Sequence, residues 1–227
     1  MFKKAMIAGA VVLASVGANA ATANLTVSGT ITPEACAITL GSSGTVDYGA
    51  LSAVTVKSYG VATSAYSAPP KTIALNVTCS APTAVSLAWT DNRSSSVVNF
   101  DGVAANNTVR FGLGTSGTTN IGAYQLDFTG LQVSATASGT PAAPAGYLTR
   151  TTGTTGAWSA ASGLTAQWVT PGLSLGMKTS ATDATPPAIS TISGNLSVYS
   201  YFSKALVDSA TSAITLNGQS TVTLEYI

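Results

Sequence analysis

The side chains that most often perform catalysis or bind metals are scarce in this sequence. Its 227 residues include no histidine, which removes the commonest general base at neutral pH and excludes a Ser-His-Asp arrangement. The acidic residues occur singly, mostly where turns are expected, and no spacing indicates the carboxylate pair of a glycosidase. They are Glu34, Asp47, Asp91, Asp101, Asp127, Asp183, Asp208 and Glu225. We therefore expect no catalytic residue, no cofactor and no metal site, and we expect that the protein is not an enzyme.

Cysteine chemistry is confined to Cys36 and Cys79. A metal site or a reactive thiol would need companions, and the chain has no histidine and no C-x-x-C motif. An export signal, described below, would bring both cysteines into an oxidising compartment, where an even pair normally bonds. We predict a Cys36–Cys79 disulfide, which closes a loop of about 44 residues.

Two further patterns are similar to ligand sites. Residues 112–117 fit the dinucleotide motif G-x-G-x-x-G, but that motif needs a strand before it and a helix after it, so we expect a hairpin turn here. Trp158 and Trp168 could bind sugar as a pair, although core packing is the favoured interpretation. No basic patch with interleaved aromatic residues occurs, so we expect no nucleic-acid partner.

The N-terminal residues of the sequence predict an export signal that precedes all of the expected strands. Residues 1–20 combine Lys3 and Lys4, an apolar stretch and the small-x-small site Ala18-Asn19-Ala20, which predicts a signal peptide cleaved after residue 20. Its removal would change the formal net charge from +1 to −1, because both lysines leave with it. No segment approaches the ~20 uninterrupted apolar residues of a membrane-spanning helix.

The mature chain alternates apolar and polar residues in short runs, which Gly, Asn, Ser and Pro separate. Residues 25–32, 72–79, 84–89 and 220–227 are such runs, and no long segment shows a helical period. From about residue 134 to 191, Gly, Ala, Thr, Ser and Pro dominate, and we expect an enlarged loop and hairpin region there. Many short strands at regular spacing predict one all-β sandwich or barrel.

The two ends of the mature chain carry alternating rows of apolar or small residues. The first row, in a 15-residue arm that precedes Cys36, consists of Leu25, Val27, Gly29 and Ile31. The second row, on the last strand, consists of Val222, Leu224 and Tyr226. An apolar arm is costly to leave in water, so it is either the first strand of its own sandwich or is inserted into another molecule.

The order of these features resembles the subunits of chaperone–usher pili. Gly29 stands seven residues before Cys36, where that family has a glycine before its first cysteine. Cys79 closes the next strand in "KTIALNVTC", and Tyr226 is the penultimate residue of an alternating C-terminal strand, as in the family. The segments "IGAYQLDF" and "TISGNLSVYSYF" are also similar to segments of those subunits.

The sequence departs from the family in two places. Ile214 stands where the family has a glycine fourteen residues from the end, and Gly218 is the nearest candidate for that role. The chain is also longer than a typical shaft subunit, with the excess in the region 134–191. A shaft role is therefore less well supported by the resemblance than the fold is.

The resemblance implies an immunoglobulin-like β-sandwich of the pilin type that lacks its last strand. In that family a periplasmic chaperone fills the resulting apolar groove, and the arm of the next subunit replaces it at the outer-membrane usher, an established example of strand addition. Residues 21–35 would form the donor-strand extension, and residues 36–227 would form one sandwich domain. The donor face would consist of Leu25, Val27, Gly29 and Ile31, and the strand beside the groove and the chaperone would present Val222, Leu224 and Tyr226.

The implied function is that of a structural subunit of a surface fimbria that contributes to adhesion. Such a protein is exported through the periplasm to the cell surface. Its partners would be other pilus subunits, the periplasmic chaperone and the usher, with a host glycan or surface receptor as a further candidate. Two alternatives stay open: a receptor-binding minor or tip adhesin subunit, and a self-sufficient secreted β-sandwich that binds or hydrolyses a ligand. The arm could also fold back onto its own body, which would make a complete monomer.

Overall fold

The computed structural model describes residues 35–163 and 168–227, and these lie in one compact unit, residues 34–227. The predicted arm residues Leu25, Val27, Gly29 and Ile31 and the predicted signal peptide lie outside the described residues. The described part of the chain is mostly β-structure, and all its strand pairs are antiparallel. This confirms the prediction of an all-β protein.

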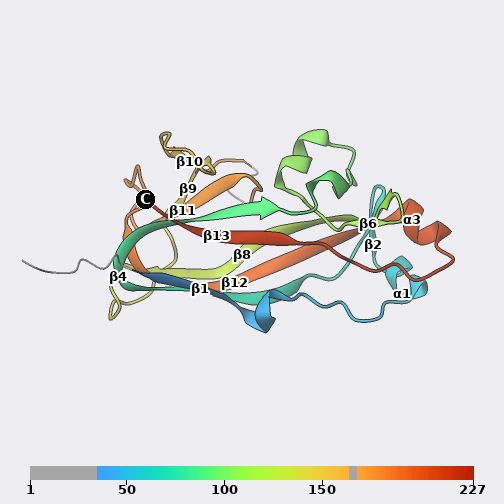
Figure 1. The fold of residues 1–227 in the computed structure, drawn as a ribbon, viewed down its shortest axis with the longest axis horizontal. Helices are drawn as coiled ribbons and strands as arrows, with labels where there is room; N and C mark the ends of the chain where they lie inside the picture. The colour runs from blue at the N-terminus through green and yellow to red at the C-terminus, as the bar shows by residue number, and fades with distance from the viewer. Residues whose placement is uncertain (1–34, 164–167) are drawn as a thin grey trace, which may run out of the picture. The chain divides into compact units, whose positions relative to one another are not determined.

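One bent strand, β4 (Lys71–Asp91, 21 residues), belongs to both layers of the fold. Its first half pairs with β1 (Cys36–Leu40) and β12 (Ala188–Ser203), and its second half pairs with β13 (Ser220–Tyr226) and β11 (Leu173–Lys178). Figure 1 shows the bend at one end of the unit. Leu75 and Leu87, one from each half, are both fully buried, so the two halves face the same core. This arrangement is that of a β-sandwich.

The remaining strands extend the two layers. In the first layer β12 also pairs with β8 (Gly122–Ser134) and β3 (Ala65–Ser67), β3 pairs with β2 (Gly60–Ala62), and β8 pairs with β5 (Phe111–Gly112). In the second layer β11 pairs with β9 (Gly146–Thr151), which pairs with β10 (Ser159–Ala160). A separate hairpin joins β6 (Thr115–Ser116) to β7 (Thr119–Asn120). Much of the enlarged region thus widens the second layer.

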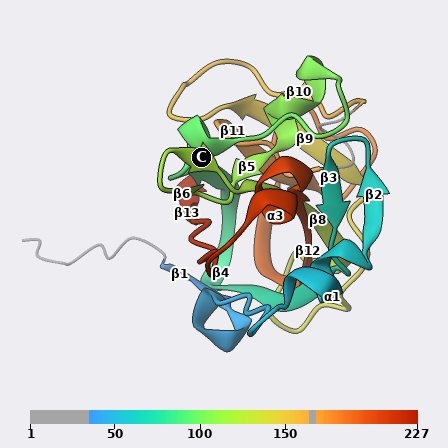
Figure 2. The same ribbon diagram turned by 90° about the vertical axis from the view of Figure 1, so that its right-hand side faces the viewer.

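Helical segments are short and lie at element junctions. The α-helices α1 (Ala53–Lys57) and α3 (Lys204–Ser209) lie at the end of the unit opposite the bend of β4 (Figure 1, Figure 2). Each begins at a serine whose hydroxyl accepts a hydrogen bond from the first turn, which satisfies a free helix N–H. The 3-10 helices are η1 (Gly41–Gly44), η2 (Ser94–Ser96) and η3 (Ala104–Val109).

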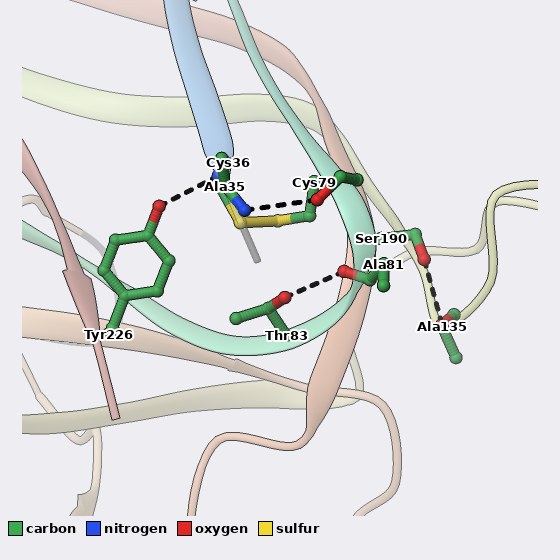
Figure 3. The surroundings of a disulfide bond; sticks show 9 residues. Ala35, Cys36, Cys79, Ala81, Thr83, Ala135, Ser190 and Tyr226 are labelled. Carbon is green, nitrogen blue, oxygen red and sulfur yellow. Dashed lines mark hydrogen bonds between the residues drawn. A yellow bond between two sulfur atoms is a disulfide. The ribbon is translucent and has the colours of Figure 1, made fainter. Parts of the chain in front are cut away.

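The predicted disulfide is present. Cys36 and Cys79 face each other in the β1–β4 register, and their Cα atoms are 3.9 Å apart (Figure 3). The neighbouring Ser80 N–H donates to the carbonyl oxygen of Ala35 at 2.9 Å, so residues 35 and 80 form a hydrogen-bonded pair. The cysteines therefore occupy a pair without mutual backbone hydrogen bonds, in which side chains approach most closely.

Replacing both Cys36 and Cys79 by alanine should lower the free energy of unfolding by about 4 kcal/mol, because the unfolded chain loses a loop constraint. Urea unfolding, followed by circular dichroism, measures the difference. The control is Thr39→Ala, an exposed position on the same strand, for which a change below about 0.5 kcal/mol is expected. Equal unfolding midpoints for the disulfide-free and wild-type proteins would contradict the prediction.

Candidate functional site

The described carboxylates serve local structure and do not gather into a catalytic or metal-binding group. Asp47 accepts a hydrogen bond from the N–H of Gly49 at 2.7 Å, and Asp91 accepts from the N–H groups of Arg93 and Gly112 at 2.8 and 2.9 Å. Within residues 35–163 and 168–227, no three His, Cys, Asp or Glu residues lie close enough to hold a metal ion. In the same part of the chain, no helix has the length and apolar character to span a membrane.

The last strand, β13, has one open edge. Among the described residues it pairs only with β4. Two hydrogen bonds at its ends fix which backbone groups point toward β4: Asn92 N–H donates to Gln219 O, and Ile227 N–H donates to Ala84 O, both at 3.0 Å. Since bonded and non-bonded residues alternate along an antiparallel pair, the odd-numbered residues of β13 bond to β4. The N–H and C=O groups of Val222, Leu224 and Tyr226 therefore point toward the open edge.

The first described strand, β1, has the complementary open edge. Its one partner in the described structure is β4, and the bonded pair of residues 35 and 80 fixes the alternation. By the same reasoning, the backbone groups of Cys36, Ile38 and Leu40 point away from β4. β1 runs away from the bend of β4 and β13 runs toward it. The Cys36 N–H, which points away from β4, donates to the Tyr226 hydroxyl at 2.9 Å, so the two open edges flank the same side of the sandwich (Figure 1).

A hollow lined mainly by apolar side chains lies between these edges. A cavity of ≈ 340 Å³ is lined by residues of β1, β4, β8, β12 and β13, among them Leu40, Trp89, Tyr124 and Val222. A second cavity of ≈ 230 Å³ lies toward α1 and α3, and Leu216 lines both. No described charged residue lines either one. We call the two cavities, with the open edges of β1 and β13, the β1–β13 groove.

The tyrosines of the groove are neutral phenols. Burial raises the pKa of Tyr124 and of Tyr48, which both line the larger cavity. The single carboxylate of β13 points to the opposite face of the sheet, where Glu225 Oε2 accepts hydrogen bonds from Ser174 Oγ at 2.6 Å and Ser86 Oγ at 3.2 Å. The groove can therefore hold an uncharged apolar segment and satisfy the backbone groups of an extended one.

The predicted residues of β13 take different places around the groove. Val222 lines the larger cavity, and Leu224 is half-buried against the core. Tyr226 is 53% exposed, and its hydroxyl accepts a hydrogen bond from the N–H of Cys36 at 2.9 Å (Figure 3). The last strand is thereby tied to the first strand beside the disulfide.

Several groove residues were not anticipated from the sequence. Tyr48 and Leu216 lie in segments without strand structure, and although short apolar–polar alternation surrounds both, nothing in the sequence places them in a groove. Ile214 and Gly218, which mark the departure from the pilus-subunit pattern, line the smaller and the larger cavity respectively. A Cβ on Gly218 would lie 3.1 Å from atoms of Leu113 and Tyr124, so this glycine sits tightly on the floor of the groove.

The glycines of the motif at 112–117 support one wall of the groove. Gly112 ends β5, and a Cβ there would lie 2.1 Å from the carbonyl oxygen of Arg93. Gly114 leaves room for the side-chain amide of Asn217, and the backbone N–H of Asn217 donates to Leu113 O at 3.2 Å. Gly117, at φ +60°, lies between β6 and β7, which agrees with the predicted hairpin turn. The motif therefore permits close packing of the segment that leads into β13.

A buried charge lies outside the groove, under the loop that contains η3. Arg110 is 2% exposed, forms an ion pair with Asp101 and stacks on the Phe100 ring at 3.8 Å. Partial burial alone would raise the pKa of Asp101, but hydrogen bonds from Asn106, the Val103 N–H and Arg110, with the charge of Arg110, lower it to about 2. This cluster holds the loop onto β12 through the stacked rings of Phe100 and Tyr201.

The two candidate sugar-binding tryptophans pack in separate places. Trp158 stacks against the guanidinium of Arg150 at 4.3 Å, and Trp168 meets Tyr199 edge-on at 5.3 Å. Both side chains are half-buried. Their ring contacts agree with the packing interpretation.

Gly112→Ala should lower the free energy of unfolding by about 2–3 kcal/mol, because the new Cβ overlaps the Arg93 carbonyl and the wall of the groove must shift. The matched control is Gly117→Ala, which meets open space and costs only about 1 kcal/mol through its positive φ. Thermal and urea unfolding of the two variants measure the difference. An equal cost for both would show that the close approach at Gly112 is unimportant.

Asp101→Asn should lower stability at pH 7 by about 2 kcal/mol, because buried Arg110 loses its carboxylate. The depressed pKa of Asp101 stabilises the wild type above pH ~4, and this contribution is lost as the pH falls toward 2. The stability difference between the two proteins should therefore shrink over that window in urea titrations. The control is Lys57→Gln, which breaks an exposed ion pair and should cost less than about 1 kcal/mol. A difference that stays constant with pH contradicts this assignment.

One family model matches the part of the chain that contains β1 and β4, but not the part that contains β13. Residues 25–126 match the model of a family described as "Protein of unknown function (DUF1120)". The match includes the predicted arm row, β1 and β4, and it ends within β8, before β13. No curated protein and no solved structure matches the chain. The similarity shown is therefore to a family without an assigned function.

Proposed function

We propose that this protein is a structural subunit of a surface fimbria that polymerises by strand exchange through the β1–β13 groove. The observation that carries the proposal is the pair of open strand edges on either side of an uncharged apolar hollow. Backbone groups on both edges point into the gap, so one extended segment could bond to both at once. Strand addition of this kind combines backbone hydrogen bonds with side-chain pockets.

An unfilled groove is costly for the protein in water. The half-buried side chains of Ile38, Leu40, Val222 and Leu224 pack against the core from strands that have no outer neighbour in the described part of the chain. Each buried apolar side chain contributes about 1.5–3 kcal/mol once water is removed, and an inserted strand would complete that burial. Open edges also invite unspecific pairing with other chains. These costs favour a specific partner strand.

The N-terminal arm of a second copy is the partner that fits best. Its row from Leu25 to Ile31 spans seven residues, and β13 also has seven. Apolar or small residues alternate with polar ones along the row, as a strand with one face in a groove requires. The arm is uncharged over this row, which suits a groove without described charged residues. Repeated insertion of one arm into the next groove makes a linear fibre.

The open edges of β1 and β13 also support a chaperone and an usher as further partners. Before assembly a periplasmic chaperone would supply the missing strand, and an outer-membrane usher would be the place of exchange. Export would follow from the predicted signal peptide, and the assembled fibre at the cell surface would contribute to adhesion. A receptor-binding subunit and a self-sufficient secreted sandwich are the alternatives that the following experiment separates.

Val222→Asp should weaken fibre formation at least about 100-fold, because a carboxylate in the groove would be desolvated by the incoming strand. The matched control is Thr223→Asp, one residue along β13, whose side chain is exposed. Assembly of the exported protein, co-expressed with a chaperone, is measured by electron microscopy and sedimentation.

Two results would refute the proposal. One is normal fibre assembly by Val222→Asp, and the other is a good yield of stable monomer without any chaperone. The second result would instead support a self-sufficient sandwich. Binding of a receptor by monomers that never assemble would support the receptor-binding alternative.

A further inference from the structure

The groove is closed at the end that lies beside the disulfide. The Tyr226 hydroxyl reaches from β13 to β1 and accepts the hydrogen bond of the Cys36 N–H at 2.9 Å (Figure 3). That N–H is one of the groups of β1 that point into the gap. The hydroxyl therefore takes the place that a carbonyl of an inserted strand would otherwise occupy.

The chain's own arm is attached at this closed end. Ala35, which precedes β1, still follows the edge of β4: its carbonyl accepts from Ser80 N–H at 2.9 Å, and its N–H donates to Ser80 Oγ at 3.1 Å. A turn into the chain's own groove would have to begin at residue 34 or earlier. The arm would then run back past Cys36, through the position of the Tyr226 ring.

A barrier at this point matters because a tethered segment competes strongly with a free one. A strand joined by a short linker has an effective concentration of about a millimolar, so at micromolar protein it would outcompete another molecule's arm about a thousandfold. Self-insertion would complete the sandwich and leave a monomer that cannot polymerise.

We propose that Tyr226 excludes the chain's own arm from the β1–β13 groove and reserves the groove for the arm of a second copy. This inference rests on the proposed function. The second copy's arm enters from the other end, at the cavity beside α1 and α3. There the two helices are joined by the exposed ion pair of Lys57 and Asp208, 3.3 Å apart, which opens at little cost. Tyr226 is thus a specificity-determining residue for partner choice.

Hydrogen exchange of the arm, measured by mass spectrometry on the mature full-length chain over a wide range of concentration, tests the proposal. In the wild type, slowed exchange of residues 21–32 should appear only in oligomers and grow with concentration. In Tyr226→Phe and Tyr226→Ala the same amides should exchange about tenfold or more slowly even in dilute monomers, because the arm inserts into its own groove. Phenylalanine removes the hydrogen bond that holds the exposed ring against Cys36, so the ring can turn aside and admit the arm. Because it keeps the ring, this variant also guards against misfolding of the alanine variant.

The matched control is Tyr199→Phe. Tyr199 follows Val198 and precedes Ser200, which both line the groove, so its ring lies on the opposite face of β12. This variant should behave as the wild type. Unchanged concentration dependence in both Tyr226 variants, or a protected arm in dilute wild-type monomers, overturns the inference while leaving strand insertion intact. An arm that is unprotected in the wild type at every concentration overturns the proposed function together with the inference.

Discussion

Every backbone N–H and C=O group inside a sheet needs a partner, and on one side of β4 the described pairing stops after a single strand, at β1 along one half and at β13 along the other. β4 has neighbours on both sides along both of its halves. β1 and β13 each have one described neighbour, and it is the same strand. The bend of β4 brings the two incomplete edges to one side of the core. The apolar cavities, the tyrosine bridge and the proposed exchange all follow from this one deficit in pairing.

The positions of the charged residues also distinguish the groove from the rest of the described structure. The described charged residues lie away from the groove: Glu225 bonds to buried serines on the opposite face of the sheet, and Asp101 pairs with buried Arg110 beneath a loop. The described lining of the groove has no charge, and its tyrosines stay neutral because burial raises their pKa. With so few charged residues in the chain, their placement keeps the hollow free for an uncharged strand.

Sequence patterns predicted the parts of this arrangement that depend on local alternation. The strands around Cys79 and Tyr226, the disulfide and the turn at Gly117 all follow from short-range periodicity, export and glycine chemistry. The floor of the groove could not be predicted in this way, because Trp89, Tyr124 and Leu216 meet there from distant segments. The bridge from Tyr226 to Cys36 spans 190 positions, and no local signal encodes it. The strands of the enlarged region were obscured by its Gly, Ser and Pro content, since their pairing depends on β4 as a template.

The disulfide also determines how the fold would bear tension. Ala35 is the first described residue, and the next residue, Cys36, is joined covalently to β4. A pull on the arm therefore passes through the sulfur atoms into the longest strand, and β1 is not peeled from its edge one hydrogen bond at a time. β4 in turn supports β13 along its other half, so force delivered at one edge reaches the other through a single continuous backbone. Tension applied on the N-terminal side of Cys36 would therefore be carried to the strand that supports β13 by covalent bonds.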